Sequence, residues 1–296
     1  MNASSSESSL RRRRAAHVSI DAGTHEIAAY DYGGGGGGDA AAAVFVHATG
    51  FHGQIWGRVI DFMPAQVRCI SLDVRAHGLS GIAEHDSFAW VGFADDVATV
   101  VTHLQLSRPY GVGHSAGGAA LVLAQLNGLA TFERLWLYEP VMFPPLTGEV
   151  GANPLAIAAR RRRATFDSVR AARENFAAKP PMNRFDPAVL DDYLAGGLQT
   201  LPDGTVALRC RPEWEAQTYE NGPLHDAYER LDRLAIGVTI VRGADSDPMW
   251  QTVTSLQADA IASATLLDLP HSGHFGPMEQ PEQIARSIVA SFGLKV

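Results

Sequence analysis

The chain has 296 residues, of which 46% are hydrophobic and 19% charged, and its formal net charge at pH 7 is -8. This length suits one large domain with a sizeable insertion, or two small domains, and the apolar content is ordinary for a globular protein. The acidic balance disfavours nucleic acid and anionic membranes as main partners, because phosphate groups require a basic surface. The expected partner is therefore a small-molecule substrate.

The cysteine pattern and the lengths of the apolar runs indicate where in the cell the protein is expected. Cys69 and Cys210 are far apart and form no C-x-x-C pattern, so neither a disulfide framework nor a zinc site is indicated, and we expect no metal or cofactor. No apolar run reaches the roughly 18 to 20 residues of a membrane helix. Residues 1–16 are rich in Ser and Arg and predict a disordered tail, with a targeting segment as the alternative. The expected location is the cytoplasm, and the oligomeric state is left open.

The first elements after this tail are two short strands. Residues 17–23 and 25–33 alternate apolar and polar side chains and end in glycine, which predicts an antiparallel pair at a sheet edge. The six glycines at 33–38 then predict a flexible connector. They are not a phosphate loop, because no lysine follows at the required spacing.

Continuous apolar runs alternate with helical patterns along the next part of the chain. Such runs predict strands buried on both faces, and their alternation with helices predicts a doubly wound, mostly parallel sheet. Ligands bind beyond the carboxyl ends of strands in such sheets, so the residues that follow each strand are the candidates for chemistry. The expected strands lie in 41–50, 67–80, 108–115, 134–141 and 236–247, and the clearest helices in 93–106 and 116–128.

This alternation stops between residues 141 and 231, which predicts a helical insertion into a core of residues 17–140 and 232–296. Within it, Asp186 and Pro187 are typical of a helix N-cap and first turn, and Gly196 is a plausible stop. The run of four arginines at 160–163 is expected to be a solvated helix face.

The stretch G-H-S-A-G, residues 113–117, fits the G-x-S-x-G pattern. An apolar strand precedes it and a helix follows, which is the context that exposes a serine hydroxyl on a sharp turn. Ser115 is therefore the predicted nucleophile. A serine needs a base to take its proton and a carboxylate to orient that base.

Candidates for the base and the acid follow later strands. His274 lies in a glycine-containing loop after the last predicted strand and is preferred over His271. Asp245 and Asp247 follow the strand before it, so that one of them can orient the imidazole while the other caps a helix or faces water. Glu139, directly past another strand, is a further candidate for the acid.

Backbone donors are required for the oxyanion of the tetrahedral intermediate. One is predicted at Ala116, the residue after the nucleophile. The second is predicted in the loop after the first parallel strand, where small residues let a peptide N–H point into the site, and Thr49 is the choice.

Five stretches in this order resemble the successive signatures of the α/β-hydrolase fold superfamily: HATGFHGQIW, DVRAHGLS, GHSAGG, RGADSD and GHFGPMEQPE. The resemblance spans about residues 44–292 and implies an eight-stranded, mostly parallel sheet with a helical cap inserted after the sixth strand. It also implies Ser115 as nucleophile, His274 as general base and Asp247 as acid, with Asp245 as the near alternative.

The chain departs from this family at two turns. Ala48 stands where most members have a glycine, so Thr49 aligns with the oxyanion residue while Phe51 stays an alternative. The D-x-R-G-x-G-x-S turn also differs by an alanine, and its polar residues are interpreted as bracing the loop: Asp73, Arg75 and His77.

The predicted activity is hydrolysis of carboxylic esters with small or medium acyl groups through an acyl-enzyme on Ser115. One alternative is a carbon–carbon bond hydrolase of ring-cleavage products, which resembles the same fold and would place an acid-binding arginine in the pocket; the sequence alone places neither Arg184 nor Arg209 there. The other alternative is a non-catalytic ligand-binding member of the fold.

Overall fold

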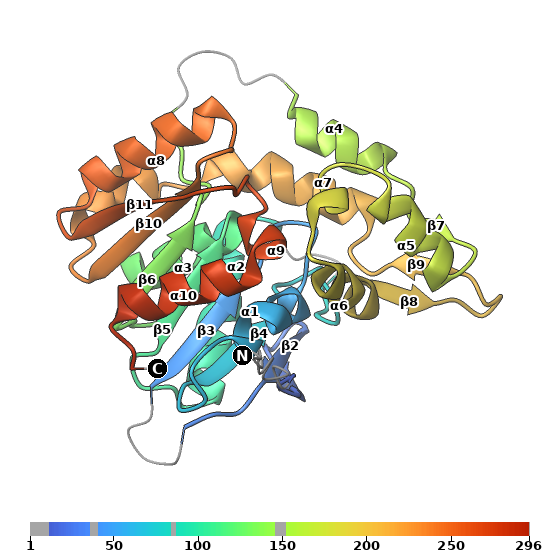
Figure 1. Cartoon of the computed structure of the whole chain (residues 1–296), viewed down its shortest axis with the longest axis horizontal. Helices are drawn as coiled ribbons and strands as arrows, with labels where there is room; N and C mark the ends of the chain where they lie inside the picture. Colours follow the sequence, from blue (N-terminus) through green and yellow to red (C-terminus); the bar gives the residue numbers. More distant parts are fainter. Residues whose placement is uncertain (1–11, 36–40, 84–86, 146–151, 296) are drawn as a thin grey trace, which may run out of the picture.

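The structure, a computed structural model, describes residues 12–35, 41–83, 87–145 and 152–295. Its centre is an eight-stranded sheet (Figure 1) in the order β1-β2-β4-β3-β5-β6-β10-β11. β2 is antiparallel to β1 and to β4, and the other neighbours are parallel. Of the two strands predicted at the sheet edge, only β1 lies there, because β2 is paired on both sides, with β1 and with β4. The strands are β1 (Ala16–Asp21), β2 (Glu26–Asp31), β3 (Ala42–Val46), β4 (Arg68–Leu72), β5 (Tyr110–His114), β6 (Arg134–Tyr138), β10 (Gly237–Gly243) and β11 (Ala264–Leu269).

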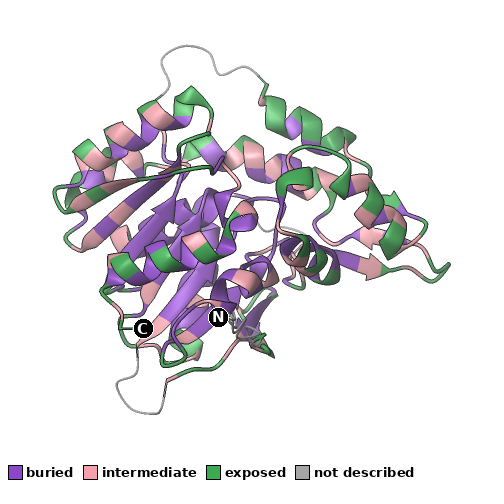
Figure 2. Ribbon diagram, in the orientation of Figure 1, coloured by how far each residue is buried: buried purple, intermediate pink, exposed green. Residues whose placement is uncertain are grey.

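The central strands are buried on both faces, as the continuous apolar runs predicted (Figure 2). Successive side chains of a strand point to opposite faces. On β3, Val44 and Val46 therefore join the hydrophobic cluster on one side of the sheet, and Ala43 and Phe45 join the cluster on the other. Because both clusters exclude water, these strands need apolar residues at every position.

Helices cover both faces, which confirms the doubly wound prediction. α2 (Trp90–His103) and α3 (Ala116–Leu126) pack on one face, and α1 (Gly57–Asp61) and α10 (Pro281–Phe292) on the other. α8 (Pro248–Ala260) contacts β10 and β11. Further helices of this part of the chain are η1 (Gly53–Trp56), η4 (Tyr228–Arg233) and α9 (Gly276–Glu279).

The segment between β6 and η4, here called the insertion, lies to one side of the sheet (Figure 1). Asp186 caps a helix as predicted, since its carboxylate accepts the N–H of Ala188 at 2.8 Å. The described elements of the insertion are α4 (Pro154–Arg161), β7 (Thr165–Phe166), α5 (Val169–Ala177), η2 (Met182–Arg184), α6 (Pro187–Gly197), β8 (Leu198–Thr200), β9 (Val206–Leu208), α7 (Pro212–Asn221) and η3 (Gly222–Leu224).

The insertion is not wholly helical, contrary to the prediction. β7, β9 and β8 form a three-stranded antiparallel sheet. Between β8 and β9 the chain turns at Pro202, Asp203 and Gly204, where Gly204 has a φ of +86° and Asp203 accepts the N–H of Thr205 at 3.0 Å. Pro, Asp and Gly in succession favour a turn, so this hairpin had a sequence signal that the helical interpretation passed over.

Part of the predicted disordered tail is folded against the protein. Residues 1–11 lie outside the described residues, but β1 begins at Ala16 and Arg12 makes two ion pairs, so the prediction of disorder is wrong for residues 12–16. The Arg12 guanidinium reaches Asp192 of α6 at 2.6 Å and Asp61 of α1 at 3.2 Å. Arg12 therefore joins the insertion to the sheet-bearing part of the chain.

The predicted glycine connector falls partly outside the described residues, because the structure resumes at residue 41 after residue 35. Gly33, Gly34 and Gly35 all have positive φ, which glycine adopts without steric cost. Across the described ranges, the structure contains no helix with the length and apolar character needed to cross a membrane.

Candidate active site

Ser115 occupies a strained turn between β5 and α3. Its φ of 54° and ψ of -115° are unusual for a residue with a side chain, and its exposed fraction is 8%. The flanking glycines permit this turn: a Cβ at Gly113 would lie 2.7 Å from Cα of Gly118, and one at Gly117 would meet the backbone oxygen of Val46. These are the features of a nucleophile elbow.

Replacing Gly117 with alanine is expected to lower the free energy of unfolding by about 2 kcal/mol or more, because backbone atoms cannot move aside as a flexible side chain can. Gly81→Ala is the matched control, since a Cβ there would lie 3.4 Å from its nearest neighbour and no positive φ is required. Urea unfolding of both variants measures the difference. Equal loss in the two would contradict the close approach at the elbow.

His274 and Glu139 meet at the carboxyl ends of the strands. Nδ1 of His274 donates to Oε2 of Glu139 at 2.6 Å, and the Glu139 side chain is fully buried. The other carboxylate oxygen, Oε1, accepts the N–H of Gly243 at 2.9 Å. Both oxygens of this buried acid are thus engaged, as a buried charge requires.

Glu139 is aimed by the strand end that carries it. It directly follows β6 and has a φ of 41°, so the chain turns sharply there. Its N–H donates to the carbonyl of Val241 on β10 at 2.8 Å, and the N–H of Ser115 donates to the carbonyl of Tyr138 at 2.9 Å. Neighbouring strands β5, β6 and β10 therefore hold the nucleophile candidate and the carboxylate in fixed relation.

The structure corrects the preference for Asp247 and Asp245 as the acid. Asp247 is the N-cap of α8, where its carboxylate accepts the N–H of Met249 at 2.8 Å, and Pro248 occupies the first turn. Asp245 is exposed, and its N–H donates to the carbonyl of Ser272 at 2.9 Å. In the described part of the chain neither carboxylate makes a hydrogen bond or ion pair with His274. The Asp–Pro pair is the same cap signal that correctly located the helix after Asp186.

His271, the weaker candidate for the base, is exposed in the turn after β11, at a φ of 57°. No hydrogen bond joins Ser115 to His274 among the described residues. In proteins without bound substrate such hydrogen bonds are often long and shorten in the substrate complex.

His114 and Tyr138 hold the loop that carries His274. Nε2 of His114 donates to the carbonyl of His274 at 2.8 Å, and the hydroxyl of Tyr138 donates to the carbonyl of Gly273 at 2.7 Å. Burial, together with the neighbouring His274, keeps the pKa of His114 well below its usual value, so its ring stays neutral.

Two backbone N–H groups are available for an oxyanion. Thr49 lies in a turn after β3, and its N–H makes no hydrogen bond with any described residue. Ala116 is the first residue of α3, where helix N–H groups have no partner within the helix. The alternative donor, Phe51, instead gives its N–H to the carbonyl of Ala48 at 3.2 Å. The geometry thus favours Thr49 over Phe51.

The polar turn after β4 braces the loop that follows β3, as interpreted from sequence. The buried carboxylate of Asp73 accepts the N–H of Gly53 at 2.6 Å and that of Leu79 at 2.7 Å. The guanidinium of Arg75 pairs with the buried Asp96 at 2.7 Å. These contacts fix two loops that border the site.

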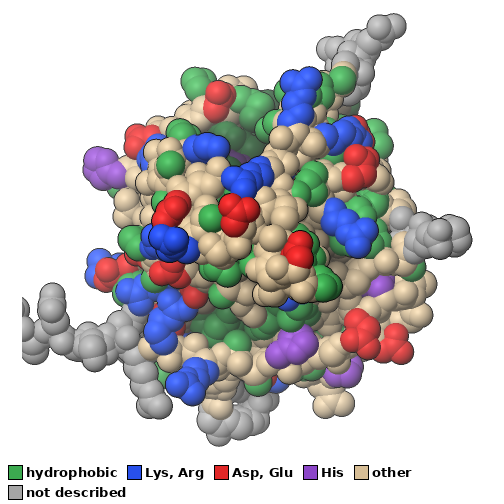
Figure 3. Space-filling view, turned by 90° about the vertical axis from the view of Figure 1, so that its right-hand side faces the viewer, with side chains coloured by type: hydrophobic (Ala, Val, Ile, Leu, Met, Phe, Trp, Pro, Cys, Tyr) green, Lys and Arg blue, Asp and Glu red, His purple; other side chains and the backbone are tan. Residues whose placement is uncertain are grey.

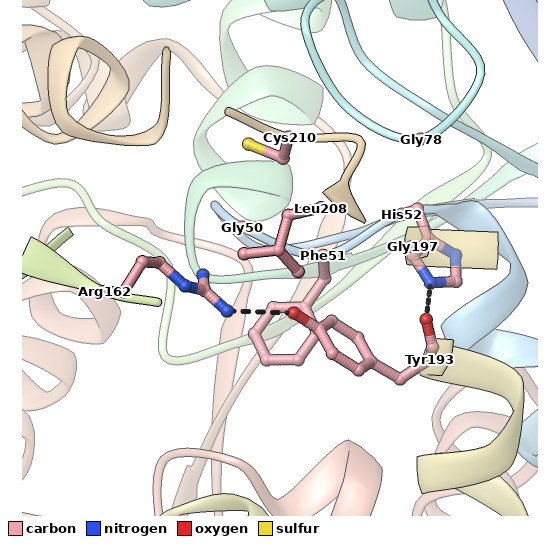
Figure 4. A pocket seen from close by; sticks show the side chains of 9 residues that line it. All are labelled: Gly50, Phe51, His52, Gly78, Arg162, Tyr193, Gly197, Leu208 and Cys210. Carbon is pink, nitrogen blue, oxygen red and sulfur yellow. Dashed lines mark hydrogen bonds between the residues drawn. The ribbon is translucent and has the colours of Figure 1, made fainter. Parts of the chain in front are cut away.

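A small cavity of about 10 Å³, enough for roughly one water molecule, lies between the insertion and the loop that follows β3 (Figure 4). Arg162 enters it, donating to Glu215 at 2.5 Å and to the hydroxyl of Tyr193 at 3.0 Å. The two arginines whose place the sequence left open make other contacts: Arg184 pairs with Glu279 at 3.2 Å, and Nε of Arg209 donates to the carbonyl of Leu198 at 3.0 Å.

The arginine run of the insertion divides accordingly. Arg160, Arg161 and Arg163 are exposed, as predicted for a solvated face, whereas Arg162 turns inward. Figure 3 shows this side of the molecule, where basic and acidic side chains are intermixed over the surface. Within the described ranges, no three His, Cys, Asp or Glu side chains gather in a way that could hold a metal ion.

Comparison with known proteins identifies the class of protein. Residues 43–287 match the family described as "Alpha/beta hydrolase family", and the chain belongs to that family. The solved structure of E-2-(acetamidomethylene)succinate hydrolase superimposes with a TM-score of 0.79 at 18% identity, covering 95% of this chain and 100% of that one. This agreement confirms the predicted superfamily and fold.

Two relatives show similarity to this chain in sequence. The chain is 24% identical over 274 residues to the bifunctional esterase/perhydrolase DCH of Acinetobacter calcoaceticus, covering 83% of this chain and 89% of the relative. It is 32% identical over 238 residues to the magnesium-chelatase 30 kDa subunit of Rhodobacter capsulatus, covering 75% and 77%. The family and the esterase relative support hydrolase activity without identifying a substrate.

Proposed function

We propose that this protein hydrolyses carboxylic esters with small or medium acyl groups through an acyl-enzyme on Ser115. The observation that carries the proposal is the 2.6 Å hydrogen bond between Nδ1 of His274 and the buried Glu139, at the carboxyl ends of the central strands where Ser115 occupies its elbow. The proposed triad is therefore Ser115, His274 and Glu139, with a glutamate in place of the aspartate expected from sequence.

In this mechanism, Nε2 of His274 takes the proton of the Ser115 hydroxyl as Oγ attacks the ester carbonyl. Glu139 stays ionised, keeps the proton of the resting imidazole on Nδ1, and stabilises the imidazolium. The N–H groups of Thr49 and Ala116 bind the oxyanion. The alcohol leaves with the proton from His274, and a water molecule activated by the same imidazole then releases the acid.

The surroundings of the site support an apolar acyl group of limited size. Three phenylalanine rings from separate segments meet beside His274: Phe51 of the oxyanion loop, Phe185 of the insertion and Phe275. Their ring centroids are 5.9 to 6.1 Å apart, and the Phe275 centroid is 5.1 Å from that of His274. These packed rings come from both the insertion and the sheet-bearing part of the chain, and they favour a short acyl chain beside His274.

Labelling with a fluorophosphonate probe tests the nucleophile, and an ester chain-length series tests the substrate. We expect stoichiometric labelling at Ser115 by peptide mass analysis, none in Ser115→Ala, and faster turnover of p-nitrophenyl acetate and butyrate than of long-chain esters. An unlabelled Ser115 contradicts the proposal. Labelling without ester turnover, followed by activity on dienoate substrates, would instead favour the carbon–carbon bond hydrolase.

A further inference from the structure

The ring of Trp250 lies flat against the imidazole of His274. The two ring centroids are 4.7 Å apart and the planes differ by 9°, which is face-to-face contact. Trp250 is 7% exposed, and the ring of Phe143 packs on it at 5.8 Å. The indole is therefore fixed in place independently of His274.

The start of α8 determines where Trp250 sits. Asp247 caps this helix through the N–H of Met249, Pro248 begins the first turn, and the N–H of Trp250 donates to the carbonyl of Asp247 at 2.8 Å. The carboxylate and the carbonyl of Asp247 thus both accept hydrogen bonds from the first turn of the helix. The aspartate expected to contact the imidazole instead anchors the helix that brings Trp250 to it.

The other neighbours of the imidazole leave one face to Trp250. Glu139, after β6, holds Nδ1, and it is the charged side chain in direct contact with the ring. His114, at the end of β5, contributes a ring at 5.0 Å, and Phe275 contacts the imidazole edge-on at 78°. The Arg184–Glu279 pair lies beside the backbone of Gly273.

We propose that Trp250 is a positioning residue for His274: its indole face fixes the plane of the imidazole and stabilises the imidazolium formed while Ser115 is attacked. This inference rests on the proposed function. A cation over an indole face is attracted by the negative face of the ring system. The hydrogen bond to Glu139 fixes the position of Nδ1 but still allows the imidazole to rotate about that bond. The stacked indole of Trp250 prevents this rotation.

Kinetics of Trp250→Leu and Trp250→Phe test the role. Leucine keeps an apolar side chain but removes the ring face, so kcat per fluorophosphonate-titrated site should fall about tenfold with little change in KM. Phenylalanine keeps a smaller aromatic face and should restore part of this loss. Trp214→Leu, which removes an indole stacked on Arg211 in the insertion, is the matched control and should keep the parent kcat.

Fluorescence gives a readout that does not depend on turnover. Contact with an imidazolium quenches indole emission, so the full-length protein should show an emission component that changes with pH while circular dichroism confirms the fold. This component should vanish in Trp250→Phe and in His274→Gln and persist in Ser115→Ala. If esters are not turned over yet the titration is present, the proposed function fails and the stacking stands. Parent kcat in Trp250→Leu, or a titration unchanged in Trp250→Phe, would overturn the inference.

Discussion

Replacing Glu139 with glutamine is expected to lower kcat for p-nitrophenyl butyrate by about 10⁴-fold, the loss typical when the acid of such a triad becomes an amide. Glutamine has the same shape, and its oxygen can still accept the N–H of Gly243, so the strand ends stay in place. It can, however, present an N–H to Nδ1 of His274, which favours the tautomer whose Nε2 cannot accept the serine proton. Stopped assays at matched active-site concentration measure the effect.

Amides at the two aspartates after β10 are the matched controls. Asp245→Asn should keep the parent rate, because that carboxylate is exposed and away from His274. Asp247→Asn should lose less than tenfold, since asparagine caps helices about as well as aspartate. A 10⁴-fold loss in Asp247→Asn together with an active Glu139→Gln variant would return the acid to β10.

The free energy of unfolding is expected to fall by several kcal/mol between pH 7.5 and 5.5. Burial lowers the pKa of five histidines, that of His77 to about 4: His47, His52, His77, His114 and His225. These rings stay neutral in the folded state but bind a proton below about pH 6.5 when the chain unfolds. Each one therefore stabilises the fold fully above its unfolded pKa, and this contribution is lost as the pH falls, by about 1.4 kcal/mol over this range for a ring such as His77 whose folded pKa lies below it.

Urea unfolding at pH 7.5 and 5.5 checks this dependence. Most carboxylates stay ionised in this window, so the histidines dominate the slope. His77→Asn removes one titrating group and should reduce the difference between the two pH values by about 1.4 kcal/mol. His103→Gln, at an exposed position, should leave it unchanged. Equal free energies of unfolding at the two pH values would show that these rings are already protonated, or solvated, in the folded protein.

The sheet and the elbow could be predicted because their signals are local. Apolar runs such as that of β3 report burial on both faces, and Gly113 and Gly117 report the close backbone approach at Ser115. Local signals did not identify which carboxylate contacts His274, because that choice depends on the backbone geometry at the strand ends. Glu139 and Asp247 both follow strands, and only the sharp backbone turn at Glu139, together with the hydrogen bonds to Val241 and Gly243, directs one of them to His274.

The insertion was less predictable for a different reason. Its helices have clear caps, but the side chain that enters the cavity comes from Arg162, just past the end of α4 where the backbone becomes extended. Helical periodicity therefore no longer describes the direction of that residue, and a run of four arginines gives no signal that one differs. The contact with Tyr193 of α6 is set by tertiary packing alone.

Two of the three proposed catalytic groups belong to one rigid unit. Ser115 and Glu139 end neighbouring strands, and each is tied by its own N–H to the next strand in the sheet. His274 comes instead from a loop held by a few contacts, among them those from His114, Tyr138 and Trp250. The site is therefore aligned when this one loop packs correctly against the carboxyl ends of the central strands. Mutations that weaken the packing of the loop can abolish activity while the sheet stays folded.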